Sequence, residues 1–170
     1  MKINNISIMS RTALDFELEV AKPVTVFCGE HAALVLNLIR EVLGEEGSEV
    51  DPDSVDDGRF VIHADVDMEG KNYSICYIRN ADFIGDNRIA VNFKPNSIEY
   101  SGEDTLEFLE KRSATKESRP VFIYPDELAK RDDPVSFIRE LASSDRQVFV
   151  GATKCPVIDH PAVMCVNVQA

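Results

Sequence analysis

The first part of the chain carries two different hydrophobic patterns. From Leu14 to Val20 apolar residues alternate with acidic ones, which is the period of a strand with one buried face. This stretch and the apolar-rich Ile3 to Ile8 predict a hairpin that turns across Ser10 to Ala13. Val24 to Cys28 is instead an almost continuous run of β-forming residues, typical of a strand buried on both faces, and Gly29 follows it at once.

A helix is predicted directly after that glycine. From Ala32 to Leu43 the apolar residues follow helical spacing, and Gly44 suits the C-terminal cap. The chain therefore opens with a strand, a glycine turn and a buried helix.

The central part of the chain is acidic at first and then rich in strand patterns. Glu45 to Gly58 predicts a solvated loop. Phe60 to Asp67 and Asn72 to Arg79 alternate in polarity across a turn, which predicts a hairpin. Arg88 to Phe93 predicts a further strand, and Glu103 to Arg112 a short helix.

The last third returns to alternating strands and helices. Val121 to Tyr124 and Val148 to Val150 are short buried-type strands, and the first is followed by an acidic turn. A helix opens at Asp133-Pro134, an N-cap followed by proline, and Ala162 to Val168 predicts a final strand. Buried strands separated by amphipathic helices predict an α/β fold, with a largely parallel sheet flanked by helices and an additional antiparallel β lobe.

The length and the hydrophobic content of the chain predict its number of domains and its relation to a membrane. With 170 residues, of which 44% are hydrophobic, the chain is expected to form a single domain over residues 1–170, with an antiparallel β insertion at about 59–94. The longest apolar stretch, Ala32 to Leu36, is far shorter than the ~20 residues that span a bilayer. Met1 to Asn5 also lacks the apolar segment of a signal peptide, so we expect a cytoplasmic protein with no membrane contact.

The net charge narrows the class of partner. The chain has 18 Lys and Arg against 30 Asp and Glu, a formal charge of -12. This excess disfavours direct nucleic-acid binding, because neutralising phosphates with Lys and Arg supplies much of that affinity. The acidic charge favours a protein partner with a basic surface. A second copy of the chain is the other partner that we consider.

The four cysteines predict no metal site. Cys28, Cys76, Cys155 and Cys165 are scattered, no two form a C-x-x-C pair, and each lies in or beside an apolar run, so we expect buried, reduced thiols. Cys155 and Cys165 flank His160 at equal spacing, but prolines intervene and a fourth ligand is missing.

The opening unit resembles a known family. The strand Leu14 to Val20, the segment Val24 to Glu30 and the helix up to Gly44 look like the N-terminal lobe of ABC-type ATPase heads of the SMC/RecF-like AAA group. That family reads as a strand, G-E-N-G-x-G-K-S/T and a helix, and Gly29 and Glu30 match its first two motif positions. The resemblance implies a P-loop NTPase-like fold, in which the remnant phosphate loop comprises Gly29, Glu30, His31 and Ala32.

The motif of this chain departs from the family's at the positions that bind the phosphates and the metal ion. Its second and third glycines fall on Ala32 and Leu34, its lysine on Val35 and its metal-binding hydroxyl on Leu36. The lysine supplies positive charge to the phosphates and the hydroxyl holds magnesium, so this chain offers neither contact.

The second family motif is also altered. Pro120 to Glu127 resembles a Walker B strand in which Pro125 is either inserted before the acids or replaces the metal-binding Asp. By resemblance, Asp126 and Glu127 would be the magnesium-orienting and water-activating carboxylates; the other interpretation is a solvated acidic turn. Further on, Asp132-Asp133-Pro134 resembles the family's D-loop, and the family's switch histidine is either replaced by Thr153 or has no counterpart.

These observations lead to three hypotheses. The leading one is a degenerate P-loop ATPase-like domain, a non-hydrolysing binding or regulatory module without a cofactor. The alternative is an active ATP hydrolase with a non-standard phosphate loop, in which Lys22, Lys154 or a partner's arginine replaces the missing lysine and ATP and Mg²⁺ bind. The second alternative is an unrelated acidic protein-interaction domain.

Overall fold

The structure is a computed structural model that describes residues 1–10, 15–43, 60–68, 70–79, 91–94, 97–100 and 116–168. The chain divides into two compact units: the first comprises Met1–Glu19 and Asn37–Glu117, and the second Val20–Leu36 and Ser118–Ala170. Two compact units can still belong to one folding domain, so the single domain over residues 1–170 stays a prediction.

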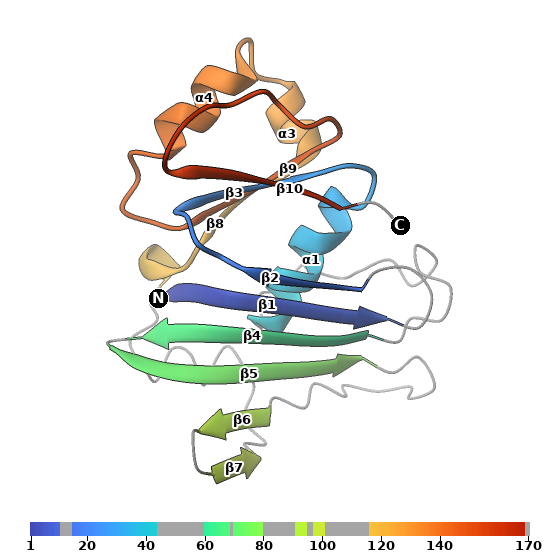
Figure 1. Ribbon diagram of the computed structural model, residues 1–170, viewed down its shortest axis with the longest axis vertical. Coiled ribbons are helices and arrows are strands. Elements are labelled where there is room, and N and C mark those ends of the chain that lie inside the picture. The colour runs from blue at the N-terminus through green and yellow to red at the C-terminus, as the bar shows by residue number, and fades with distance from the viewer. Residues whose placement is uncertain are drawn as a thin grey trace. The chain divides into compact units, whose positions relative to one another are not determined.

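The first unit holds a six-stranded sheet in the order β2-β1-β4-β5-β6-β7 (Figure 1). All neighbouring strands in it are antiparallel. Its strands are β1 (Lys2–Ser10), β2 (Phe16–Glu19), β4 (Phe60–Met68), β5 (Lys71–Arg79), β6 (Val91–Lys94) and β7 (Ser97–Tyr100). Both predicted hairpins are confirmed. The sheet includes the N-terminal hairpin as well as strands from the stretch 59–94, and it continues to Tyr100.

A β-bulge explains an irregular spacing in β1. Ile3 pairs with Val66 and Asn5 with Asp65, so the register shifts by one residue between Ile3 and Asn5. An extra residue in one strand lets side chains three apart point to the same face. Ile3 and Ile6 are accordingly both fully buried, although strict alternation would place them on opposite faces.

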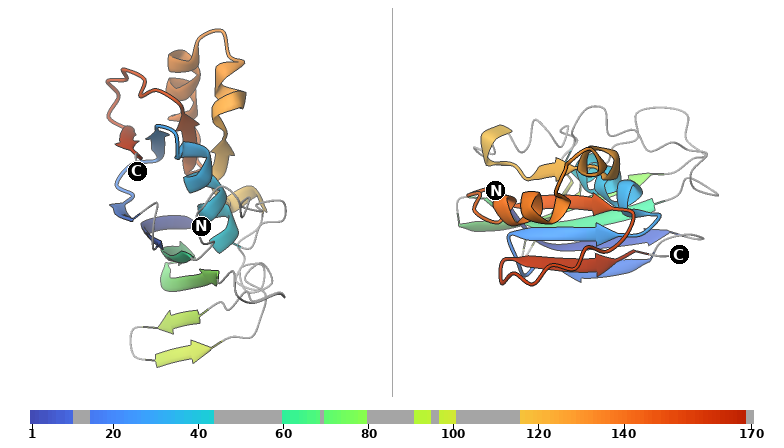
Figure 2. Two further views of the ribbon diagram at one scale, coloured as in Figure 1. Left: turned by 90° about the vertical axis from the view of Figure 1, so that its right-hand side faces the viewer. Right: turned by 90° about the horizontal axis from the view of Figure 1, so that it is seen from above.

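The second unit holds a parallel four-stranded sheet in the order β10-β3-β9-β8, which Figure 2 shows from above. Its strands are β3 (Val24–Cys28), β8 (Val121–Ile123), β9 (Val148–Ala152) and β10 (Val163–Asn167), and every pairing is parallel. All residues of the two central strands, β3 and β9, are buried, which confirms the predicted burial of β3 on both faces. β9 runs two residues beyond the predicted Val150, through Gly151 to Ala152.

Two short helices cover one face of the parallel sheet. Leu128 of α3 (Pro125–Ala129) and Ile138 of α4 (Pro134–Leu141) belong to one buried cluster with the alternate residues Val24, Val26 and Cys28 of β3. The predicted opening of α4 is confirmed, because the side chain of Asp133 accepts a hydrogen bond from the Ser136 amide. The predicted acidic turn after β8 is wrong: those residues form α3, because burial of Leu128 favours a helical turn.

The opposite face of the same sheet is aromatic. Phe27 and Phe149 stack with ring centroids 6.0 Å apart, and Phe122 and Phe149 with centroids 5.6 Å apart. These rings stand on the neighbouring strands β3, β9 and β8, where offset stacking adds to the burial of apolar area.

The helix α1 (Ala32–Val42) follows β3 as predicted. It belongs to the second unit up to Leu36 and to the first unit from Asn37 onward. A single turn of 3-10 helix, η2 (Lys116–Ser118), precedes β8. The predicted cap at Gly44, the acidic loop Glu45 to Gly58 and the helix Glu103 to Arg112 lie outside the described residues.

The predicted fold class is confirmed as far as architecture goes, since a parallel sheet flanked by helices accompanies an antiparallel sheet. Among the described residues, no helix has both the length and the apolar character that a membrane crossing requires.

Candidate functional site

The turn between β3 and α1 is the predicted phosphate loop, and it is short. β3 ends at Cys28 and α1 begins at Ala32, so only three residues connect them. Gly29 has a φ of 119°, in the left-handed region that favours glycine. Its amide donates to the Ala152 carbonyl at 2.9 Å, and its carbonyl accepts from the Ala32 amide at 3.2 Å. The helix has therefore begun where the family's loop would place its second glycine.

The side chains at the first turns of α1 are apolar and enclosed. Val35 and Leu36, at the positions of the family's lysine and hydroxyl, are both fully buried. The Val35 amide donates to the His31 carbonyl at 2.9 Å, as a helical residue does. Hence this turn combines the strand–glycine–helix backbone of a phosphate site with the side chains of a hydrophobic core.

The other two residues of the turn, Glu30 and His31, lie beside each other. The His31 Nε2 atom is 3.7 Å from the Glu30 Oε1 atom, with the His31 side chain 21% and the Glu30 side chain 74% exposed. Gly29, Glu30, His31 and Ala32 thus form one contiguous turn, and their contact with a phosphate stays a prediction.

The predicted Walker B-like acids lie in the first turn of α3, directly after β8. Asp126 is exposed, and the Glu127 carboxylate is 3.9 Å from the Arg131 guanidinium, one helical turn further on. The guanidinium also lies 4.1 Å from the centre of the Phe137 ring. Glu127 is therefore paired within its own surface region, and its role toward a water molecule stays a prediction.

Pro125 and Leu36 meet at Gly151. A Cβ on Gly151 would lie 2.9 Å from Pro125 Cδ and 3.1 Å from Leu36 Cδ1, well inside ordinary contact distance. Leu36 stands at the motif position of the metal-binding hydroxyl, and Pro125 at that of the metal-binding Asp if it replaces this residue. Apolar atoms of both side chains therefore lie against Gly151.

The two lysines suggested as substitutes lie at opposite ends of the parallel sheet. The Lys22 Nζ atom donates to the Val163 carbonyl at 3.2 Å, beside the start of β3. The length of β3 separates Lys22 from Gly29 by roughly 20 Å, at about 3.3 Å per residue. Lys154 is exposed and follows Ala152, whose carbonyl holds the Gly29 amide. Thr153, which lies between Ala152 and Lys154 in the sequence, is also exposed.

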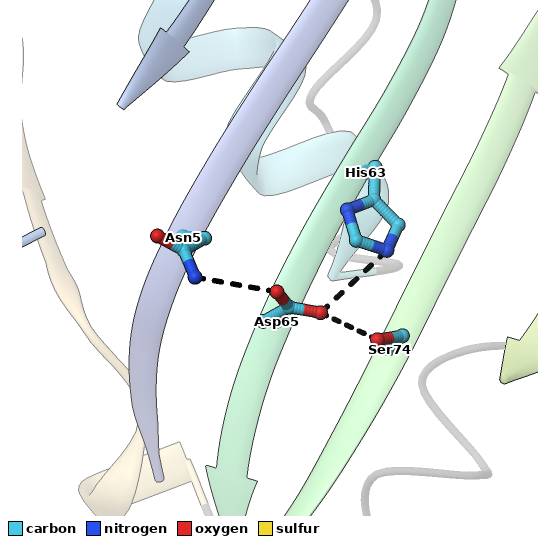
Figure 3. Close-up of polar contacts among 4 residues, drawn as sticks. All are labelled: Asn5, His63, Asp65 and Ser74. Carbon is cyan, nitrogen blue, oxygen red and sulfur yellow. Dashed lines mark hydrogen bonds and ion pairs between the residues drawn. The ribbon is translucent and has the colours of Figure 1, made fainter. Parts of the chain in front are cut away.

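A polar cluster in the antiparallel sheet was not predicted from the sequence (Figure 3). The Asn5 amide donates to Asp65 Oδ2 at 3.3 Å, the Ser74 hydroxyl donates to Asp65 Oδ1, and His63 Nε2 lies 3.6 Å from the same oxygen. Ser74 thus directs its proton at Asp65 and not at His63, so the group lacks the nucleophile–base contact of a hydrolytic triad. Its sequence signal is the alternation of polar with buried residues along β4.

Three cysteines come together at the end of β3. The Sγ atoms of Cys28, Cys155 and Cys165 all lie within 4.8 Å of one another, and the Cys28 thiol donates to Cys155 Sγ at 2.8 Å. All three are reduced; Cys28 is buried, whereas Cys155 and Cys165 are exposed. The predicted burial is therefore wrong for Cys155 and Cys165. Cys155 lies on the connection after β9, and Cys165 lies on the outer strand β10.

The thiol cluster differs from the spacing noted in the sequence. His160 is not part of it; its Nδ1 atom accepts a hydrogen bond from the Ala162 amide at 3.1 Å. Cys28 takes its place, although it lies 127 residues from Cys155. The Cys76 side chain lies outside the described part of the structure.

The surroundings of the cluster favour the neutral thiols. Burial raises the pKa of Cys28, and the hydrogen bond and charge repulsion of Cys155 raise it further. Burial, followed by repulsion from Cys155, raises the pKa of Cys165 from 9.0 to about 11. Without a cation, these two groups therefore remain protonated at neutral pH.

Comparison with known proteins identifies no family. No protein-family model matches the sequence, and no curated protein matches it. Among solved structures, the chain is similar to the recombination mediator protein RecF, in a structure with ATPγS in the RecFOR pathway, at 16% identity and a TM-score of 0.47. The alignment covers 82% of this chain and 36% of the RecF chain, so this chain spans little more than a third of that length.

Proposed function

We propose that the chain is a P-loop ATPase-like domain that does not hydrolyse ATP and acts as a binding or regulatory module. One observation carries the proposal: Leu36 and Pro125 both lie against Gly151, where the family motifs would hold the metal if Pro125 replaces the metal-binding Asp. The strand–glycine–helix unit of β3 and α1 supplies the backbone frame.

The residues present do not fit magnesium and ATP. Phosphoryl transfer is catalysed by positioning and by positive charge on the phosphates, supplied by a lysine and a metal ion held by a hydroxyl and a carboxylate. Val35 and Leu36 offer no such group and are fully buried. Opening this contact to a hydrated cation would expose apolar surface and desolvate the ion without ligands.

A phosphate-release assay together with calorimetric titration of ATP and Mg²⁺ tests this proposal. We expect no turnover by the wild-type protein and no change on Glu127→Gln. Turnover that Glu127→Gln abolishes would contradict the proposal, because it would require an activated water beside this carboxylate.

The alternative, an active hydrolase, is favoured by one feature: exposed Lys154 lies at the same end of the sheet as the Gly29 turn. If Lys154 replaces the missing lysine, Lys154→Ala should abolish nucleotide binding. Lys130→Ala, which removes another exposed lysine, is the matched control. Equal effects of the two substitutions would reject a specific role for Lys154.

The module's partner, in our proposal, is a protein with a basic surface or a second copy of this chain. The formal charge of -12 supports a basic protein, because complementary charge accelerates association. Such binding should weaken as salt rises, since exposed charges further apart than about 10 Å are largely screened at 0.1 M. An interaction that does not depend on salt would favour an apolar contact.

A further inference from the structure

The three-cysteine cluster is assembled by the order of strands in the parallel sheet. Cys165 of β10 pairs with Val26 of β3, and Asn167 pairs with Cys28. Because side chains alternate along a strand, Cys28 and Cys165 lie diagonally on the same face of the sheet. Cys155 comes from the connection that leaves β9, the neighbour of β3 on its other side. Three separate segments thus direct one thiol each to a single point.

We propose that Cys28, Cys155 and Cys165 form a three-thiolate site for a thiophilic metal ion, Zn²⁺ or Cu⁺. Thiolate sulfur is the ligand that selects these ions over magnesium or calcium. The proposal does not depend on the absence of ATP hydrolysis, because its ligands are separate from the altered phosphate-loop residues.

The distances suit a shared ion. A Zn–S bond of about 2.3 Å with tetrahedral angles places two sulfur atoms about 3.8 Å apart. All three sulfurs already lie within 4.8 Å of one another. The 2.8 Å contact between Cys28 and Cys155 must widen by about 1 Å to accept the ion. Cys155 is exposed on a connecting segment, which is better placed to move than the buried Cys28.

Metal binding also resolves the electrostatics of the cluster. Each thiol releases its proton to the buffer as a metal–sulfur bond forms, so no oxidant or reductant takes part. The three thiolates formed in this way then share one cation. The charge of the ion compensates the cost of placing the Cys28 thiolate beside the apolar core.

The coordination is open on the solvent side. Within the described part of the chain, the group that can surround the ion consists of these three cysteines, two of which are exposed. Cu⁺ is satisfied by three thiolates, whereas tetrahedral Zn²⁺ takes a fourth ligand from water or from a bound partner. The ion would tie the segment after β9 to β3 and β10, at the sheet end that carries the Gly29 turn.

The test uses the reduced full-length chain with a chromogenic chelator as competitor. We expect one Zn²⁺ per chain, and a loss of affinity of about 100-fold or more in Cys155→Ser and in Cys165→Ser, since removing an outer-shell partner can already cost up to that much. Both replaced residues are exposed, so circular dichroism should show that the variants remain folded. Cys76→Ser, in β5, removes the fourth thiol and is the matched control.

Two further measurements decide the outcome. Co²⁺ as a probe should give a thiolate-to-metal charge-transfer band that weakens with each Ser substitution, and a parallel competition with a Cu⁺-specific chelator shows which ion binds more tightly. Equal Zn²⁺ and Cu⁺ affinities in wild type and both variants would overturn the proposal, as would an equal loss in Cys76→Ser. Failure of the reduced protein to bind either ion, with a Cys28–Cys155 disulfide forming in air, would also overturn it and assign the cluster to redox chemistry.

Discussion

Two regions at the same end of β3, the Gly29 turn and the thiol cluster, differ in whether they carry a sequence motif and in the chemistry of their side chains. The Gly29 turn has the backbone order of a phosphate-binding loop, but the motif positions behind it carry buried Val35 and Leu36. The thiol cluster has no recognisable motif, yet its side chains form a usable set of ligands. Under the proposed function, the order of backbone elements is therefore no guide to the chemistry of a site, and a set of ligands can form without a linear motif.

Restoring the phosphate-loop side chains is the strongest way to break this comparison. The double variant Val35→Lys with Leu36→Thr should lose about 3–5 kcal/mol of unfolding free energy or more, because it buries a charge and leaves a cavity. We expect no ATP binding by calorimetry and a marked drop in the urea midpoint. A stable double variant that binds ATP would contradict this expectation, because it would show that only the side chains at these two positions prevent nucleotide binding. Ala33→Lys, at a half-buried position on the same helix, is the control.

Loading the thiol cluster should stabilise the protein. At a free Zn²⁺ concentration 100 times the dissociation constant, binding to the native state alone adds about 2.7 kcal/mol to the free energy of unfolding. Chemical denaturation with and without Zn²⁺ measures this difference. It should vanish in Cys165→Ser and persist in Cys76→Ser; the same stabilisation in all three proteins would place the ion elsewhere.

The apolar contact at Gly151 can be tested by overfilling it. Gly151→Ala places a methyl group 2.9 Å from Pro125 and 3.1 Å from Leu36, so we expect a loss of about 1–3 kcal/mol of stability. Adding Pro125→Ala should recover part of it by making room. If the two substitutions are simply additive in denaturation experiments, Pro125 and Gly151 are not in contact.

Asp133 gives the smallest expected effect. Hydrogen bonds from the Ser136 amide and hydroxyl hold the pKa of Asp133 below its usual 3.8, so the folded state favours the carboxylate. Its stabilisation is present above about pH 3.8 and is lost as the pH falls through the lower, folded-state pKa. Asp133→Asn keeps the cap without the charge.

Thermal unfolding from pH 6 to pH 2 measures that contribution. The difference in midpoint between the wild type and Asp133→Asn should shrink as the pH falls. A difference that does not change with pH would show that the charge of Asp133 contributes nothing to the cap.

Short-range patterns made much of the fold predictable. The hairpins, the buried strand β3, the helix α1 and the N-cap of α4 follow from residue periodicity and capping within a few positions. The bulge before Asn5 and the turn of helix α3 were not predicted, because the first depends on pairing with β4 and the second on burial of Leu128.

The sequence by itself determined most of the strands and the helices α1 and α4, and that the motif positions for lysine and hydroxyl are apolar. Only the tertiary structure decided that Leu36 and Pro125 meet at Gly151 and that Cys28, Cys155 and Cys165 converge. The physical reason is the same in both cases. Parallel neighbours in a sheet come from distant parts of the chain, so the order β10-β3-β9-β8 creates contacts that no local spacing records.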